Sequence, residues 1–206
     1  GSQCTGSVVV LDVNDFSVLC AQSYPNYDLD KYMNDPQYRE DLLLNKDGQN
    51  AMWNRCFWQG YPIGSAMKPA VALAALQEGV IDTSTQFRCG YTYYNADMPD
   101  FHPLCMGTHG YLNVIEALTV SCNIFFYDTG YNLGIDNMNL YQRKLGLGEL
   151  TGVEIYESDG TLAGPDEKED WYGGDTIMAA IGQSDNLITP VQLATYAATI
   201  ANNGTR

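Results

Sequence analysis

The sequence predicts an α+β fold in which a pair of antiparallel strands precedes a mostly helical chain. Residues 7–13 are a β-branched run, and residues 17–21 are expected to return as the second strand after an Asn-Asp turn. Farther along, apolar residues recur at helical spacing over 112–120, 124–133 and 138–145. No linker, internal repeat or low-complexity stretch interrupts the order. These observations indicate one α+β domain.

The other segments complete this order. Residues 30–55 are polar, and we expect a loop with one short helix there. A helix is expected over 65–79, followed by an irregular stretch at 83–110 that has turn-forming residues and no sustained period. Residues 146–174 are irregular for the same reason, and a short helix is expected at 176–181.

The last helix has clear boundary signals. Thr189 caps its start, Pro190 occupies the first helical position, and the helix is expected to run to Asn202, before Gly204.

The composition of the 206-residue chain excludes several partners. Hydrophobic residues make up 45% and charged residues 17%, which is typical of a globular protein. The formal net charge of -15 repels nucleic acid and anionic lipid headgroups, so we expect neither as a partner. No apolar run is long enough to cross a membrane, and no signal peptide opens the sequence. A targeting segment of an extracytoplasmic parent is therefore expected upstream.

The passage Gly64-Ser65-Ala66-Met67-Lys68-Pro69 carries the first chemical signal. Ser65 and Lys68 lie three positions apart at the opening of a helix, so they share a face and the amine can take the hydroxyl proton. Unpaired N–H groups at the helix start favour an anion beside the serine. This S-x-x-K arrangement is typical of an acyl-transfer nucleophile. The structural alternative is an N-cap serine with a solvated lysine.

A second motif, Ser121-Cys122-Asn123, lies between two predicted helices. Alternate side chains on an exposed turn project to the same side, so Ser121 can relay a proton while Asn123 holds the lysine and a substrate amide. The alternative is that Ser121 simply caps the helix that follows.

The order of these motifs resembles the transpeptidase domain of class B penicillin-binding proteins, most closely the elongation-type group called penicillin-binding protein 2. The resemblance covers residues 6–206. Residues 62–69 match P-G-S-x-x-K-P, with Ile63 in place of a glycine, and 121–127 match S-x-N/D-x-F-F-Y. The remaining matches lie at 7–13, 21–28, 109–113, 145–148, 151–152, 174–176, 181–183 and 189–194.

The resemblance implies a fold like that of serine β-lactamases, an antiparallel sheet with flanking helices and a mostly helical subdomain. It also implies that Ser65 is the acylated nucleophile and Lys68 its general base. Ser121 and Asn123 would form the second catalytic motif and, with Gly64, bind substrate. The implied activity is that of a peptidoglycan D,D-transpeptidase, which needs no cofactor for catalysis and is trapped by β-lactams.

The resemblance further implies partners and a location. The partners are peptidoglycan stem peptides, β-lactams and the cell-wall elongation machinery, including a glycosyltransferase. The location is the extracytoplasmic face of the bacterial cytoplasmic membrane, with a membrane-anchored parent and a soluble fragment.

The third motif of the family, K-T/S-G, does not occur within the 206 residues. The strands that carry it are expected beyond Arg206, so the domain is expected to be partial. Since a lost oxyanion donor costs roughly two to three orders of magnitude in rate, we expect these residues alone to acylate slowly or not at all. Phe16 stands where a turn glycine is usual, which indicates a local variation of the hairpin loop.

The insertion at 83–110 is a possible metal site. If the neighbours of Cys122 face the cleft, its thiol points away toward Cys89, Cys105 and His109, which together make a Cys₃His set suited to structural zinc. Some elongation-type relatives have a zinc site built from acidic residues, a histidine in H-G and a cysteine in S-x-N. His109 and Cys122 occupy the last two positions. A Cys89–Cys105 disulfide and buried free thiols are the alternatives, and the reserve ligands are Asp97, Asp100 and His102.

Two other functions share these motifs. A β-lactam sensor or class D-type β-lactamase also uses S-x-x-K, and a non-catalytic scaffold of the cell-wall machinery can keep the fold. The long insertion and the 174–183 stretch favour the transpeptidase over the first, and intact motifs argue against the second.

Overall fold

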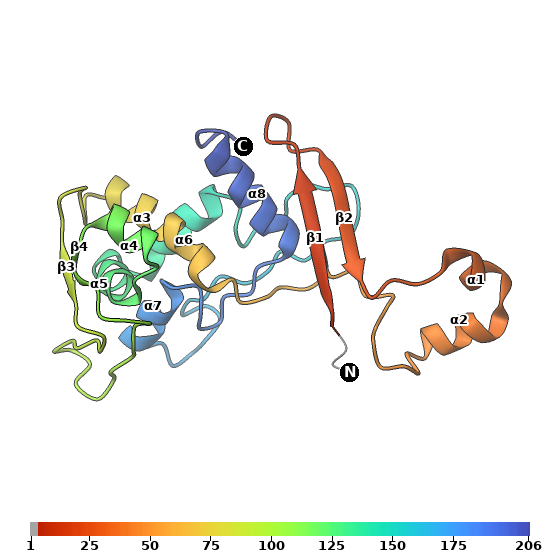
Figure 1. The fold of residues 1–206 in the computed structure, drawn as a ribbon, viewed down its shortest axis with the longest axis horizontal. Coiled ribbons are helices and arrows are strands. Elements are labelled where there is room, and N and C mark those ends of the chain that lie inside the picture. Colours follow the sequence, from red (N-terminus) through yellow and green to blue (C-terminus); the bar gives the residue numbers. More distant parts are fainter. Residues whose placement is uncertain (1–3) are drawn as a thin grey trace.

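The N-terminal hairpin stands near the middle of the molecule, between a helical arm and a larger helical lobe (Figure 1). The computed structural model describes residues 4–206. Strands β1 (Gly6–Leu11) and β2 (Val18–Tyr24) pair antiparallel, with Val9 opposite Ala21. The predicted hairpin is confirmed. Phe16 takes the left-handed conformation, with φ of 63°, in the turn where a glycine is usual.

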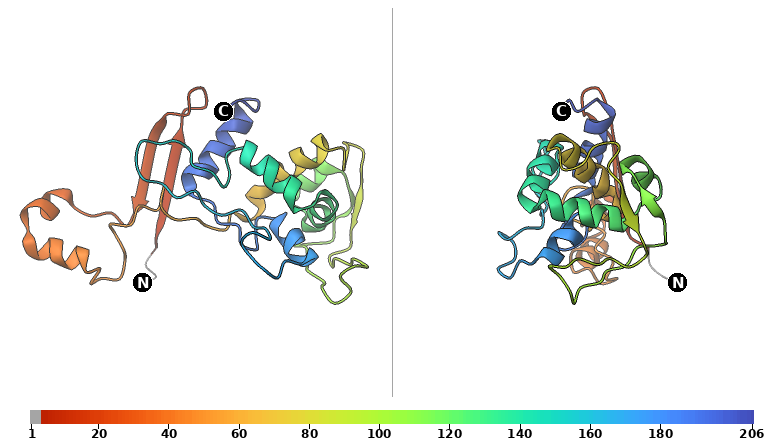
Figure 2. Two further views of the ribbon diagram at one scale, coloured as in Figure 1. Left: turned by 180° about the vertical axis from the view of Figure 1, so that it is seen from behind. Right: turned by 90° about the vertical axis from the view of Figure 1, so that its left-hand side faces the viewer.

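Helix α8 (Pro190–Ala201) packs against β1 and lies between the hairpin and the lobe (Figure 2). The Thr189 hydroxyl accepts from the Gln192 N–H, and the Gln192 side chain reaches back to the Thr189 N–H, which completes a capping box. The helix therefore begins and ends close to where the sequence predicts.

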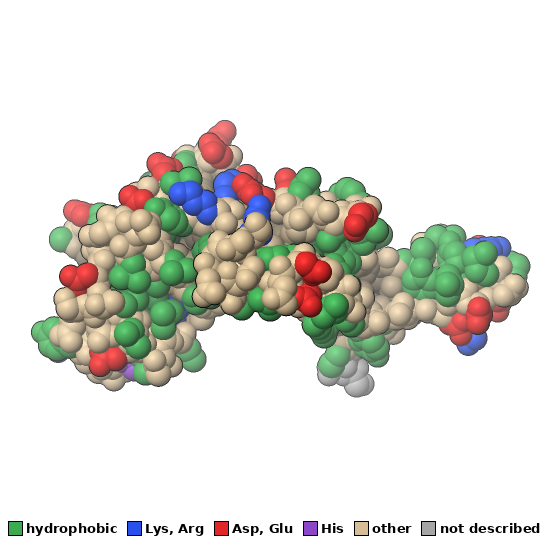
Figure 3. All heavy atoms as spheres, turned by 90° about the horizontal axis from the view of Figure 1, so that it is seen from above, with side chains coloured by type: hydrophobic (Ala, Val, Ile, Leu, Met, Phe, Trp, Pro, Cys, Tyr) green, Lys and Arg blue, Asp and Glu red, His purple; other side chains and the backbone are tan. Residues whose placement is uncertain are grey.

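The arm consists of two short helices, α1 (Leu29–Asn34) and α2 (Pro36–Leu43), where we expected one. The signals for the pair are local: the carboxylates of Asp28 and Asp35 cap the two helices, and Pro36 opens the second. Neither helix contains a buried residue. Arm and lobe both carry acidic side chains on the face shown in Figure 3.

The lobe is built around α5 (Asn123–Leu133), which is mostly buried. A short 3₁₀ turn, η1 (Gly64–Met67), leads into α3 (Lys68–Gln77), which packs against α5 and against α6 (Ile135–Lys144). Helices α4 (Val114–Thr119) and α7 (Gly173–Ala179) also contact α5. The α+β fold class is thus confirmed, with the core in the helical lobe.

The 83–110 insertion is more regular than predicted. Strand β3 (Phe87–Cys89) pairs antiparallel with β4 (Gly110–Leu112), and an isolated bridge joins Thr92 and Leu104. Strands of three residues are too short for an alternating pattern to stand out, which explains the error. The pairing places Cys89 opposite Gly110 and so brings the ends of the insertion together.

Among the described residues, no helix combines the length and apolar character needed to cross a bilayer.

Candidate active site and cysteine cluster

Ser65 lies in η1 and is exposed to solvent. The backbone of Gly182 packs against this turn and holds it in place. The Gly64 N–H donates to the Gly182 carbonyl at 3.0 Å. A Cβ on Gly182 would lie 2.1 Å from the Gly64 carbonyl oxygen, and both glycines have positive φ. Only glycine allows two backbones to approach this closely, so Gly182 holds the turn that presents Ser65.

Lys68 is buried, with 1% of its surface exposed, and its amine lies against the second motif. Nζ donates to the Ser121 carbonyl oxygen at 2.7 Å, to Ser121 Oγ at 3.0 Å and to Asn123 Oδ1 at 2.7 Å. It also lies 5.6 Å from the centre of the Phe126 ring. The structure thus brings the two sequence motifs together through one amine.

Burial lowers the pKa of Lys68 from 10.5 to about 8, because the charged amine loses its hydration. The group therefore loses its proton within reach of physiological pH, as a general base must.

The backbone between α4 and α5 directs the second motif. Ser121 has φ of 53°, a left-handed conformation that is uncommon for a residue with a side chain and recurs at functional sites. Ser121 and Asn123 turn toward Lys68, while the side chain of Cys122 is fully buried on the opposite side. This is the alternation that the sequence predicts.

The predicted contact between Lys68 and Ser65 is not present. No hydrogen bond joins Nζ to Ser65 Oγ in the described part of the chain, because three oxygens of the second motif occupy the amine. The Ser65 N–H has no hydrogen-bond acceptor within residues 4–206 either. The serine therefore offers both a hydroxyl and a free backbone donor to solvent.

The four predicted metal ligands lie together. The sulfurs of Cys89, Cys105 and Cys122 and the His109 imidazole are all within 4.8 Å of one another. Cys105 Sγ is 3.9 Å from Cys122 Sγ and 3.7 Å from His109 Nδ1, and Cys89 Sγ is 3.4 Å from that nitrogen. The three cysteines are buried and the histidine is half-buried.

The cluster is linked directly to the second motif. The Asn123 N–H donates to Cys105 Sγ at 3.3 Å. Burial raises the pKa of the Cys105 thiol, but the backbone N–H groups of Gly107, Asn123 and Ile124 outweigh burial and leave that pKa below its usual value. Burial raises the pKa of Cys122 to about 12. Cys105 is thus the sulfur most readily ionised of the two.

The structure does not support the disulfide or the reserve ligands, and it leaves buried free thiols as the alternative to a metal site. Cys89 and Cys105 are free thiols, so the disulfide is absent. The reserve ligands lie elsewhere: Asp97 accepts from the Tyr131 hydroxyl at 2.7 Å, and the His102 ring packs on Tyr94 at 4.7 Å between centroids. Asp100 lines a separate pocket with Asp97. None of the three belongs to the cluster of Cys89, Cys105, His109 and Cys122.

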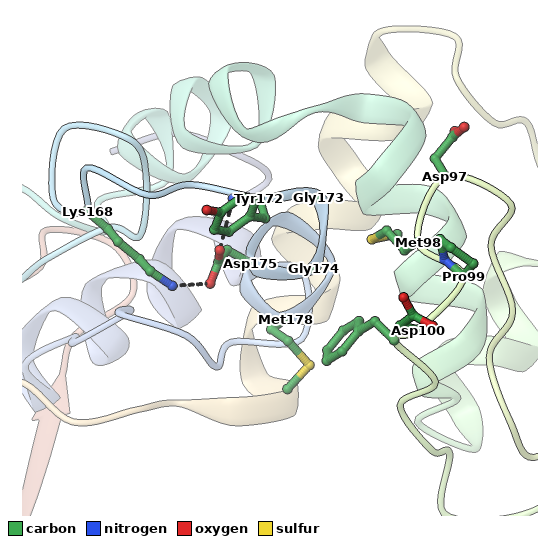
Figure 4. Close-up of a pocket in the computed structure, with 11 residues that line it drawn as sticks. Asp97, Met98, Pro99, Asp100, Lys168, Tyr172, Gly173, Gly174, Asp175 and Met178 are labelled. Atoms are coloured by element: carbon green, nitrogen blue, oxygen red, sulfur yellow. Dashed lines mark hydrogen bonds and ion pairs between the residues drawn. The ribbon is translucent and has the colours of Figure 1, made fainter.

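That pocket, of about 560 Å³, lies between the insertion and the start of α7 (Figure 4). Phe101 packs over Gly174, where a Cβ would lie 3.3 Å from the ring, and Lys168 pairs with Asp175 at 2.6 Å. We did not predict it from the sequence. The adjacent glycines 173–174 are the one signal that a side chain packs closely on this backbone.

Comparison with known proteins gives consistent results. The family model for the penicillin binding protein transpeptidase domain matches residues 6–206. The chain is 34% identical over 206 residues to peptidoglycan D,D-transpeptidase MrdA of Haemophilus influenzae, covering 97% of this chain and 32% of that protein. It is 31% identical to the MrdA protein of Acinetobacter baumannii, again over 97% of this chain and 31% of the relative. The chain thus spans about a third of the length of these relatives.

Solved structures agree. The crystal structure of Pseudomonas aeruginosa PBP2 in complex with WCK 5153 superposes with a TM-score of 0.88 at 29% identity, over 98% of this chain and 47% of the other. PBP2 of Helicobacter pylori in complex with MreC superposes with a TM-score of 0.86 at 28% identity, over 96% and 38% of the two chains.

Proposed function

Because the chain belongs to the penicillin-binding protein transpeptidase family, we propose that it forms the nucleophile-bearing part of a peptidoglycan D,D-transpeptidase. The observation that carries the proposal is the buried Lys68 amine, which touches Ser121 and Asn123 and lies one helical turn from Ser65. The activity joins peptidoglycan stem peptides through a serine acyl-enzyme, and β-lactams intercept it.

The first step begins with a neutral Lys68. Loss of a proton leaves Nζ with two N–H donors and a lone pair, so one of its three oxygen contacts is released and the lone pair turns to Ser65 Oγ. Ser65 Oγ bonds to the penultimate D-Ala carbonyl carbon while its proton moves to Lys68. The free Ser65 N–H donates to the oxyanion that develops.

The second motif completes the exchange. As the C–N bond breaks, Ser121 Oγ passes a proton from Lys68 to the amine of the departing D-Ala, since it already hydrogen-bonds to Nζ. Asn123 holds the lysine through Oδ1 and can contact a substrate amide. An amine from a neighbouring stem then attacks the ester, and the proton it loses returns to Ser65.

Membership of the family supports a proposal for the partners and the location. We propose stem peptides as substrates, the elongation machinery with its glycosyltransferase as assembly partner, and the extracytoplasmic face of the cytoplasmic membrane as the place of action. The MreC complex of the Helicobacter pylori relative supports the assembly partner.

Acyl-enzyme lifetime tests the function in a chain that contains these residues together with a K-T-G strand. We expect a penicillin adduct that persists for hours, and release of D-Ala from a stem-peptide donor. Hydrolysis of the adduct within seconds would instead identify a β-lactamase. A stable adduct without D-Ala release would identify a sensor, and no adduct would identify a scaffold.

We also propose that Cys89, Cys105, His109 and Cys122 bind a structural zinc ion. Tetrahedral zinc with ordinary bond lengths places two sulfurs about 3.8 Å apart and a sulfur and a nitrogen about 3.6 Å apart. Three of the six separations between these atoms, at 3.9, 3.4 and 3.7 Å, fit that geometry, and all six are within 4.8 Å. Four protein ligands leave no position for water, so the ion would support structure and take no part in catalysis.

The zinc would fasten the insertion to the turn that carries Ser121 and Asn123, because Cys122 lies between them and Cys105 accepts the Asn123 N–H. Metal analysis tests the site: we expect about one zinc per chain, and loss of zinc in Cys122→Ser. The exposed Cys20 supplies the control, since Cys20→Ser should keep the metal. Zinc-free protein with all six cysteines reduced would contradict the proposal.

A further inference from the structure

Trp53 is exposed although its backbone is fixed firmly. Trp53 is 44% exposed and lies in the loop that follows α2, beside β2. Its carbonyl oxygen accepts from Ser23 Oγ at 3.0 Å and from Arg55 Nη1 at 3.3 Å. Ser23 Oγ in turn accepts from the Arg55 N–H at 3.1 Å, which ties this loop to β2. A large apolar side chain held rigidly in solvent is more informative than one on a mobile loop.

Arg55 fixes the backbone of the loop that carries Trp53. Arg55 is buried, with 6% of its surface exposed, and its guanidinium donates to the carbonyl oxygens of Gln49 and Asn50 as well as Trp53. Arg55 therefore fixes the backbone of the loop 49–53, from which the Trp53 indole projects.

Two further aromatic side chains form a row with Trp53. Trp58 lies edge-on to Trp53, with 5.6 Å between ring centroids and 86° between planes. Trp58 Nε1 donates to the Tyr156 carbonyl at 3.0 Å, and the Tyr156 ring, 74% exposed, lies 6.2 Å from Trp58. The result is a row of three aromatic side chains, of which the two end members are exposed.

A cavity of about 350 Å³ adjoins this row and is lined without a single charged side chain. The chain as a whole carries 25 acidic and 10 basic residues and so repels anions, while the lining of this cavity holds no charged group to pair with an ionic ligand. Its polar groups are the hydroxyls of Ser23 and Tyr27 and the amides of Gln22, Asn26 and Asn54. The side-chain oxygens of Asn26 and Asn54 accept from the backbone N–H groups of Tyr27 and Cys56, and Gln22 Nε2 donates to the Ser23 carbonyl, so these amides offer mainly their remaining N–H donors. Aromatic faces beside amides suit a ligand that is apolar on one face and rich in hydroxyls at its edge.

We propose that this aromatic cavity binds a neutral, β-linked N-acetylated glycan. The axial C–H bonds of a β-linked sugar present a weakly positive face that is attracted to the negative face of an indole. Hydroxyl and acetamido groups at the sugar edge pair with the lining amides, as polar groups do in small-molecule sites. The proposal deepens the proposed function and rests on it, because stem peptides hang from such a glycan.

The cavity and the nucleophile are near enough for one polymer to reach both. Only residues 59–64 separate Trp58 from Ser65, so the two lie at most about 25 Å apart along the chain. A glycan strand held in the aromatic cavity would raise the local concentration of the peptides attached to it.

Titration with chitotetraose, an uncharged β-1,4-linked N-acetylglucosamine tetramer, tests the proposal by calorimetry and tryptophan fluorescence. We expect saturable binding that Trp53→Ala weakens at least about tenfold, since truncating an aromatic anchor removes most of its contact. The matched control is Tyr111→Ala, which removes an aromatic side chain of 67% exposure on β4 and should leave binding unchanged. Cellotetraose, which lacks the acetamido groups, should bind more weakly.

Absence of chitotetraose binding, or equal binding by Trp53→Ala, would overturn the glycan site. Fluorescent penicillin labelling of the same variants, in a chain that also has a K-T-G strand, separates this failure from failure of the proposed function. Trp53→Ala should label normally, which also shows that it folds. Glycan binding without any labelling would refute the transpeptidase and leave the glycan site standing.

Discussion

Lys68 is a buried amine whose contacts suit a base better than a structural cation. No carboxylate within residues 4–206 pairs with it, and its acceptors are a carbonyl, a hydroxyl and a carboxamide oxygen. A buried lysine without a counter-ion is held near neutrality by the cost of dehydrating its charge. The residue that the motif predicts as the general base is therefore also the one whose pKa burial lowers toward neutrality.

The pH dependence of acylation tests whether Lys68 acts as a base with a lowered pKa. The pKa of Lys68 is lowered to about 8, and only the neutral amine can take the Ser65 proton, so the rate must rise with pH. We expect the acylation rate constant to increase about fivefold from pH 7 to 8 and less than about twofold from pH 8 to 9. Stopped-flow measurement with a chromogenic β-lactam, in a chain with a K-T-G strand, gives the profile. Lys68→Arg, a permanent cation, should not acylate; a flat profile from pH 6 to 9 would refute the assignment.

At the scale of elements, the site depends on segments that meet behind the nucleophile. Helix α7 ends just before Gly182, whose carbonyl holds the Gly64 N–H. Asn186 is buried and donates to the carbonyl oxygens of Ala179 and Gln183, so it fixes the loop that contains Gly182. The turn that presents Ser65 is thus supported from a helix more than a hundred residues farther along the chain.

Gly182→Ala should therefore damage both stability and acylation. Any side chain at this φ of 73° costs about 1–2 kcal/mol, and the contact 2.1 Å from the Gly64 oxygen adds a further loss of about 1–3 kcal/mol. Gly204→Ala is the matched control, because its φ is 83° and no atom lies within 4 Å of the new Cβ. Urea unfolding and penicillin labelling compare the two variants. An equal loss of stability in both would show that the close approach is unimportant.

At the scale of the whole molecule, the arm and the lobe differ in how they are stabilised. Helices α1 and α2 bury no side chain, whereas α5 buries most of its residues. Without tertiary packing, helices this short are marginal in water. We expect amide hydrogens of α1 and α2 to exchange at least about a hundredfold faster than those of α5 in hydrogen-exchange mass spectrometry. Equal protection in the isolated chain would contradict this account of the arm.

Local signals explain which parts of the fold and site could be predicted. The β-branched run of the hairpin and the Thr189-Pro190 cap act within a few residues, and so does the alternation that turns Cys122 away from Ser121. Lys68 hydrogen-bonds to Ser121 and Asn123 and not to Ser65. This choice could not be predicted, because it depends on segments more than fifty residues apart. The pocket between the insertion and α7 could not be predicted for the same reason, and neither could the contact between Gly182 and Gly64. Both form only when segments distant in the sequence pack together.

The central claim is that Ser65 is the nucleophile, and the position of a covalent adduct tests it most directly. A chain with these residues and a K-T-G strand is incubated with penicillin, digested, and mapped by mass spectrometry. The account predicts one acyl group, on Ser65, and none in Ser65→Ala that is otherwise folded. An adduct on Ser121 or any other residue, or an adduct that survives in Ser65→Ala, would contradict it.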